Sequence, residues 1–209
     1  KSLLRAALSI FLVFAFVTGI MLFKSNMYQW QLQSAKQRFG NWIVMLYDSN
    51  IEENKELKKH PYLNESGKAS IDNYVYEEGE CTDIKVGYMT DEFLRIGNIS
   101  LQCGRMPEKD DEAAIEWDSL IKLNQGTQIG QEIHIEVREG SSQTTETIEK
   151  TYKLTGILNN YTNVWNGGEY IPGIVVTEGE GEAVNRIGKA AYILSLIHIS
   201  EPTRRRGIS

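Results

Sequence analysis

An uncharged apolar run from Ala6 to Phe23 constrains this sequence more than any other feature. Its 18 residues would form about 27 Å of helix at about 1.5 Å per residue, just enough to cross the hydrocarbon of a bilayer. Arg5 and Lys24 bracket the run, and it is apolar on every face, which argues against a buried core helix. The sequence therefore predicts a transmembrane helix within residues 1–24, and the residues expected inside the membrane include Ala6, Phe11, Phe16 and Phe23.

A cleaved signal peptide is the alternative to a retained anchor. The start of the chain is basic, but the run exceeds the usual length of about 7–15 residues and ends in Ile20–Phe23, not in a small-x-small cleavage site. Tyr28 and Trp30 follow Lys24, where the headgroup region favours amphipathic aromatic side chains. We therefore expect the helix to be retained, with residues 25–41 continuing it as a helical stalk that Gly40 ends.

The rest of the chain up to Ile193, about 170 residues, has the size of a single domain. The formal net charge of the sequence is −6, which argues against a nucleic-acid partner because such a partner requires a basic face. Cys81 and Cys103 are too few for a disulfide framework. One bridge between them and two free thiols are both open.

The two ends of the chain do not look like natural ends. It begins at Lys1 without an initiator methionine, so upstream sequence is expected. Leu194 to Arg204 looks like the translation of a transposase adapter used in sequencing libraries, and Arg205–Ser209 like index sequence. An edge strand with a basic tail is the alternative. We therefore expect residues 194–209 to lie outside the natural protein, which would stop near Ile193, and we assign no function to His198.

Residues 42–193 predict an α+β fold class, a mixed α/β domain of short elements. The apolar run in Trp42–Tyr47 predicts a strand buried on both faces. Thr90 is a candidate N-cap and Gly97 a helix stop. The other expected strands are Ser70–Tyr76, Asp83–Met89, Glu112–Glu116, the hairpin of Glu132–Arg138 with Thr147–Leu158, and Tyr170–Thr177. The expected helices are Glu52–His60, Asp91–Ile96, a helical segment from Trp117 to Asn124, and Gly181–Ile187.

The search for chemistry in the sequence is largely negative. His60 and His134 have no metal-ligand partner at motif spacing, and no zinc-hydrolase or nucleophile-elbow motif is present. Gly181–Lys189 has the wrong spacing for a phosphate loop. The acidic segment Glu108–Glu112 lacks the spaced ligands of an EF-hand and is expected to be a solvated loop. We therefore predict no catalytic residue, no cofactor and no metal site.

The tryptophans are candidates for a hydrophobic groove or for core packing. We expect Trp42 and Trp117 to pack in the core. Trp165 lies among Asn, Gly and Val residues in a loop sequence, so we expect it near the surface.

Several short motifs resemble those of the FtsX/MacB-like family of ABC transporter permeases. Gly104–Pro107 matches a G-R-x-P segment of that family, and the strand-helix unit Glu112–Asn124 follows it. Gly126–Gly130 matches a G-x-x-I-G turn before a strand, and Leu154–Ile157 matches a hydrophobic-x-G-I segment. The family-motif residues are Gly104, Arg105, Pro107, Gly130 and Gly156. Gly130 and Gly156 also have a simpler interpretation as turn and bulge glycines.

The resemblance implies a transport role and no reaction. In this family a transmembrane helix precedes a large extracytoplasmic domain, which combines a βαβ-type unit with a β-rich insertion, here near residues 117–166. Dimeric permeases pair with an ATPase, and the domain transmits nucleotide-driven motion to peptides, lipoproteins or partner proteins. The implied partners are an ATP-binding cassette ATPase subunit, a homo- or heterodimeric permease subunit and membrane lipid. The implied location is the bacterial cell membrane, with the soluble domain outside the cytoplasm.

Two other functions stay open from the sequence. A single-pass receptor with an extracellular ligand-sensing domain has the same order of segments, and sequence beyond Ile193 would distinguish it from a permease. A membrane-tethered enzyme would require a convergent cleft of titratable groups, which these residues do not predict. The positive charges do not decide orientation, because Lys1 and Arg5 on one side face Lys24, Lys36 and Arg38 on the other.

Overall fold

The computed structural model describes residues 2–47, 61–138, 147–163, 165, 170–178 and 189–196. The chain divides into two compact units, residues 1–38 and residues 39–209. The predicted helices Glu52–His60 and Gly181–Ile187 lie outside the described residues, as does His60.

The first unit is a single helix, α1, which runs from Ser2 to Phe39, so that the predicted anchor and stalk are one continuous element. Of the described helices, it is the one long and apolar enough to cross a membrane, judged by length and composition. The side chains of Phe11, Phe16 and Phe23 are 67%, 70% and 69% exposed. The Thr18 hydroxyl donates to the carbonyl of Phe14 at 2.8 Å, so this polar group is satisfied within the helix.

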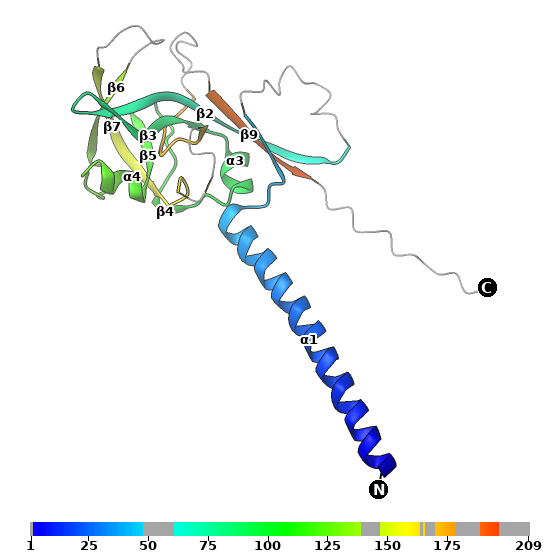
Figure 1. Cartoon of the computed structure of the whole chain (residues 1–209). Helices are drawn as coiled ribbons and strands as arrows, with labels where there is room; N and C mark the ends of the chain where they lie inside the picture. The colour runs from blue at the N-terminus through cyan, green and yellow to red at the C-terminus, as the bar shows by residue number, and fades with distance from the viewer. Residues whose placement is uncertain are drawn as a thin grey trace. The chain divides into compact units, whose positions relative to one another are not determined.

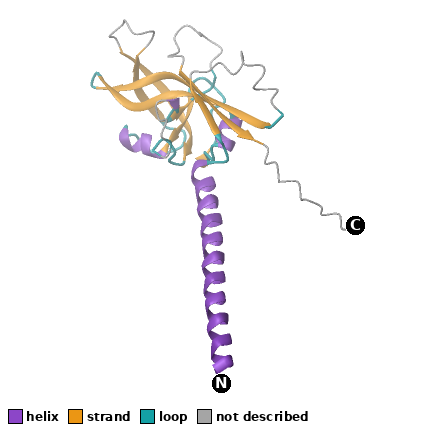
Figure 2. Ribbon diagram, turned by 45° about the vertical axis from the view of Figure 1, so that its right-hand side comes forward, coloured by secondary structure: helices purple, strands orange, loops and turns teal. Residues whose placement is uncertain are grey.

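The second unit is a mixed α/β domain with a nine-stranded sheet (Figures 1 and 2). Its helices are α3 (Asp91–Ile96) and α4 (Trp117–Lys122). Its strands are β1 (Val44–Tyr47), β2 (Leu63–Glu77), β3 (Glu80–Met89), β4 (Leu101–Gly104), β5 (Glu112–Glu116), β6 (Glu132–Arg138), β7 (Thr147–Leu158), β8 (Ile174–Val175) and β9 (Lys189–Leu196). The mixed α/β class and the preceding apolar helix match the fold class expected from the sequence.

The strand order closes part of the sheet into a ring. The path β1-β9-β2-β3-β8-β5-β7-β4 is joined by β6, which pairs with both β2 and β7. Strands β2, β3, β8, β5, β7 and β6 therefore form a small closed barrel, while β9 and β1 extend from β2 and β4 extends from β7. The β3–β8 and β5–β7 pairs are parallel, and the others are antiparallel.

Apolar side chains fill the barrel. Strand β6 alternates strictly, with Ile133, Ile135 and Val137 buried and the residues between them exposed, as a strand with one face toward a core requires. These residues belong to a cluster that also includes Val75, Ile115 and Leu154. A second cluster, built around Phe93 and Ile193, lies where α3 packs against β2 and β9.

Most predicted elements are present at or near their expected bounds. Strands β5, β6 and β7 and helix α3 have the predicted limits, and β6 pairs antiparallel with β7. The Thr90 hydroxyl caps α3 by accepting from the Phe93 amide at 3.2 Å, and Gly97 ends it. The predicted strand Tyr170–Thr177 is reduced to Ile174–Val175.

Strands β1 and β9 differ from what the sequence predicts for them. Strand β1 is not buried on both faces, because among the described strands it pairs with β9 alone, and Val44 and Tyr47 are 39% and 43% exposed at the sheet edge. Strand β9 continues three residues past Ile193, and Leu194 and Ser195 are buried. The expected end of natural sequence therefore falls inside a strand of this structure.

Candidate functional site

The family-motif glycines converge on one short stretch of β7. Gly104 in β4 is the direct partner of Gly156, and the Arg105 amide donates to the Thr155 carbonyl at 2.8 Å. Gly130 donates to the carbonyl of Leu154 at 2.7 Å. A Cβ on Gly104 would overlap the Thr155 carbonyl oxygen, and a φ of +80° would strain it further. Residues that are far apart in sequence thus meet at Leu154–Gly156.

Arg105 holds Glu112 at the start of β5. Its guanidinium donates to both carboxylate oxygens, at 2.8 Å and 2.6 Å, and the Glu108 amide adds a third hydrogen bond at 3.0 Å. Glu112 is only 5% exposed. The hydrogen bonds from Arg105, followed by that from the Glu108 amide, lower the pKa of the Glu112 carboxyl to about 2. Half-buried Pro107 lies in the loop between the two partners.

We call the contact of Arg105 with Glu112 the Arg105 clamp. It shows that one end of the acidic segment Glu108–Glu112 takes part in holding the domain together. A second member, Asp110, accepts from the Thr177 hydroxyl at 2.7 Å. In the part of the chain that the structure describes, no group of three or more His, Cys, Asp or Glu side chains is arranged to hold a metal ion. Residues 108–111 are exposed, as expected of a solvated loop, whereas Glu112 is buried and bound by Arg105, which the sequence did not predict.

The segment that follows α1, residues 39–47, is fastened to the domain at several points. Gly40 has a φ of +88°, and a Cβ there would overlap the backbone of Ile96. The Asn41 amide donates to the Ile96 carbonyl at 2.7 Å, and the Ile43 amide to the Leu194 carbonyl at 3.0 Å. We call residues 39–47 the helix exit, because the chain leaves α1 there and enters the sheet through β1.

Three stacked aromatic rings connect the helix exit to the hydrophobic cluster that includes α3. The ring of Trp42 stacks on Trp165 at a centroid distance of 5.3 Å, and Trp165 stacks on Phe93 at 5.6 Å. Trp165 is 6% exposed, so the prediction of a surface position is wrong. Its polar sequence neighbours suggest a solvated loop, but the tertiary stack covers the ring. Trp117, expected in the core, is 38% exposed at the start of α4, and that prediction is wrong as well.

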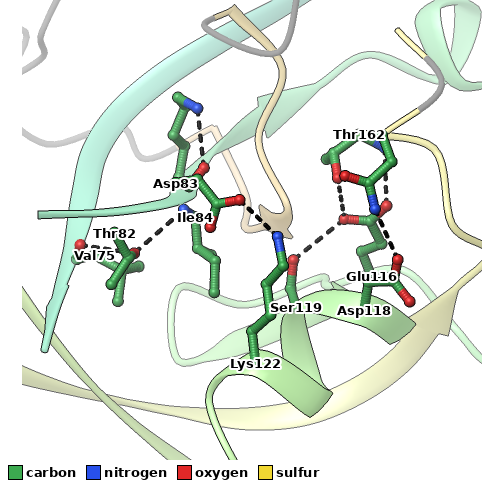
Figure 3. Close-up of polar contacts among 11 residues, drawn as sticks. Val75, Thr82, Asp83, Ile84, Glu116, Asp118, Ser119, Lys122 and Thr162 are labelled. Atoms are coloured by element: carbon green, nitrogen blue, oxygen red, sulfur yellow. Dashed lines mark hydrogen bonds and ion pairs between the residues drawn. The ribbon is translucent and has the colours of Figure 1, made fainter.

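A buried carboxylate, which the sequence did not indicate, lies at the end of β5. Glu116 is fully buried, and its oxygens accept from the amides of Tyr161 and Thr162 at 2.7 and 2.8 Å. They also accept from the hydroxyls of Thr162 at 2.7 Å and Ser119 at 3.2 Å (Figure 3). Four donors satisfy the carboxylate, as burial of a charged group requires.

The neighbouring residue Asp118, at the start of α4, holds the same loop. It accepts from the amide side chains of Asn160 at 2.5 Å and Asn163 at 2.8 Å, and its own amide donates to Asn160 at 3.1 Å. We call residues 159–163 together with Trp165 the strap. The only signal for it in the sequence is a carboxylate at a strand-helix boundary, which is too common to identify a loop partner more than 40 positions away.

The remaining candidate residues lie apart from these contacts. His134 is on the outer face of β6, where its Nδ1 lies 3.1 Å from the Thr151 hydroxyl and 3.3 Å from Glu149. It also lines an open polar cleft of 670 Å³ beside the β2–β3 turn, together with Cys81 and several glutamates. Cys81 and Cys103 are both exposed free thiols, so no bridge joins them in this structure.

No protein-family model and no curated protein matches the sequence. The solved structures that resemble the fold include three domains of membrane proteins. A domain of a protein described as a permease from Porphyromonas gingivalis has a TM-score of 0.43 at 11% identity, with 78% of this chain covered. This chain spans 65% of that domain's length.

The other two are the periplasmic region of MacB from Actinobacillus actinomycetemcomitans and the extracellular domain of YknZ, a noncanonic ABC-type transporter from Gram-positive bacteria. Their TM-scores are 0.39 and 0.37 at 11% and 14% identity, with 78% and 69% of this chain and 79% and 71% of theirs covered. The first is described as a permease and the third as an ABC-type transporter. At these TM-scores the likeness assigns no residue a role.

Proposed function

We propose that this chain is the first transmembrane helix and extracytoplasmic domain of an ABC transporter permease of the FtsX/MacB-like kind. In this proposal α1 crosses the cell membrane with Phe11, Phe16 and Phe23 inside the bilayer. Their high exposure supports it, because large apolar side chains on all faces of a helix are stable in hydrocarbon and costly in water.

The observation that carries the proposal is the way the helix exit is fastened. The hydrogen bonds of Asn41 and Ile43 and the stack of Trp42 on Trp165 fix the residues directly after α1 to α3 and β9. A flexible tether would need none of these contacts. A domain that must follow the movements of a membrane helix requires them, because motion is transmitted through packed and hydrogen-bonded elements.

The chain is proposed to be a non-catalytic component. Its most buried carboxylates, Glu112 and Glu116, are engaged by structural donors and present no acid or base to a substrate. ATP hydrolysis then belongs to a separate chain or domain. The motif residues Gly104, Arg105, Gly130 and Gly156 act in this proposal by holding β4, β5 and β7 together, which keeps the domain rigid enough to move as one body.

A combined partner and topology experiment tests the proposal. The natural gene is expressed with its neighbouring genes, and the tagged permease is purified from native membranes. We expect a subunit with a phosphate-binding loop to copurify and to hydrolyse ATP. We also expect a membrane-impermeant maleimide to label Cys81 and Cys103 in intact cells, with a variant that carries both Cys81→Ser and Cys103→Ser as the control. Capture of a kinase domain on the same chain, or labelling only after permeabilisation, would contradict the proposal.

A further inference from the structure

We infer that the strap, residues 159–163 with Trp165, is a mechanical link between the helix exit and α4. One end of the strap places Trp165 against Trp42, and the other end is bound to Glu116 and Asp118. The link rests on the proposed coupling role of the domain, but its test requires neither ATP nor a partner protein.

The α4 end of the strap is held by several hydrogen bonds. Glu116 and Asp118 together accept five hydrogen bonds from four consecutive strap residues, Asn160 to Asn163. In addition, the Tyr161 hydroxyl donates to the Pro172 carbonyl at 2.5 Å, within the buried core. Because Glu116 is fully buried, withdrawal of the strap would remove three of the four donors to its carboxylate and leave the Ser119 hydroxyl alone, which is strongly unfavourable. The strap therefore cannot shift without displacing β5 or α4.

The end at the helix exit is held by ring packing. Trp165 stacks with both Trp42 and Phe93, and a Cβ at Gly97 would lie only 2.9 Å from its indole ring. The interior is close-packed there, so a displacement of Trp42 requires Trp165 to move. A third anchor lies at the first residue of the strap, where Asn159 exchanges two hydrogen bonds with Ser100, at 2.9 Å through its amide and at 2.8 Å through its side chain.

These contacts form one continuous path. It runs from the helix exit through Trp165 and the backbone of the strap to Glu116 and Asp118. The path joins two regions that share no strand pairing, since β1 lies at one end of the strand order and β5 is near the other. The strap is thus a shorter mechanical route than the sheet itself.

Hydrogen exchange of the full chain in detergent micelles, read by mass spectrometry, tests the link. The amides of Tyr161 and Thr162 report the α4 end, and the amides of Lys153 and Leu154 in β7 serve as a reference. In Trp42→Ala we expect the ratio of the strap exchange rate to the reference exchange rate to rise at least about fivefold. Sites that are not coupled should change this ratio by no more than about twofold.

The matched control is Ile135→Ala, which creates a cavity in the barrel cluster and lowers stability without removing a contact of the strap. Because the reference residue Leu154 belongs to that cluster, this variant speeds exchange at the reference and should not raise the ratio of strap to reference exchange by more than about twofold. If Trp42→Ala and Ile135→Ala change this ratio equally, the link is refuted. Trp42→Phe provides the same comparison with a smaller loss should the alanine variant fail to fold.

The reverse direction is the second test, because energetic coupling between two sites is reciprocal. Thr162→Val removes one hydroxyl donor to Glu116 and keeps the backbone amide. We expect it to speed exchange of the Asn41 amide, which donates to Ile96 at the helix exit, by at least about threefold relative to the reference. An unchanged Asn41 amide would overturn the link even if a permease function were confirmed.

Discussion

Replacement of Trp165 by alanine should destabilise the domain more than any change at an exposed tryptophan. Trp165 is 6% exposed, and its ring is stacked with the rings of Trp42 and Phe93. A tryptophan side chain buries about 150–250 Å², which at about 25 cal/mol per Å² corresponds to about 4–6 kcal/mol. Measured losses for such changes are about 3–5 kcal/mol, and we expect a value in that range.

The assay is urea unfolding of the full chain in detergent micelles, followed by the β-sheet signal in far-UV circular dichroism. For a loss of about 4 kcal/mol and a slope of about 2 kcal/mol per molar urea, the midpoint should fall by about 2 M. Trp165→Phe should recover more than half of the loss, because a phenyl ring can still stack between the neighbouring rings.

Trp117→Ala is the matched control. Trp117 is 38% exposed and lies outside the stack, so its removal should cost about 1 kcal/mol or less. An equal loss of stability in Trp165→Ala and Trp117→Ala would refute the view that the stack fastens the helix exit to the core.

Three further predictions concern the motif cluster and the charged pairs. Gly104→Ala should cost about 2–3 kcal/mol in a thermal melt, whereas Gly79→Ala, with a similar φ of +83° but open space, should cost only about 1 kcal/mol; equal costs would contradict the crowding argument. Because the folded pKa of Glu112 is depressed, its stabilisation is present above pH 4.5 and lost as the pH falls toward about 2. Glu112→Gln should therefore flatten the fall of the urea midpoint over that window, and an unchanged pH profile would count against the Arg105 clamp. Lys122→Ala should change stability by less than about 1 kcal/mol, because its 2.6 Å pair with Asp83 is solvent-exposed; a loss above about 2 kcal/mol would be incompatible with this.

Local chemistry made much of the fold predictable. The alternation in β6 and the Thr90 cap of α3 are encoded within a few residues, and the sequence predicted both. The apolar run of α1 is equally local. Each of these signals depends on spacing along the chain and not on which partner a segment meets.

Features that depend on tertiary partners were predicted less well. Trp165 is buried by rings that lie far from it in sequence, and β1 is exposed because, of the strands that the structure describes, one lies beside it. The closure of the barrel by β6 depends on its pairing with β2, which no local pattern specifies. Glu116 looked like an ordinary polar end of a strand, because its donors are more than 40 positions away.

The candidate site shows the same division. The short motifs drew attention to Gly104, Arg105 and Gly156, which the structure brings together on β7. The partner of Arg105 was not predicted, since Glu112 was read as part of a solvated acidic segment. The helix exit could be located from Gly40, but its fastening through Trp42 and Trp165 required the packed structure.

The most direct test of the account is whether nucleotide at an ATPase subunit changes the extracytoplasmic domain. The natural permease, purified with its ATPase in lipid nanodiscs, is treated with a maleimide, and the rate of labelling at the exposed Cys81 and Cys103 thiols is measured. We predict that trapping with ATP and vanadate changes the rate at one or both thiols, and that Trp42→Ala reduces this change while ATPase binding persists. Identical rates with and without trapped nucleotide would contradict the coupling role.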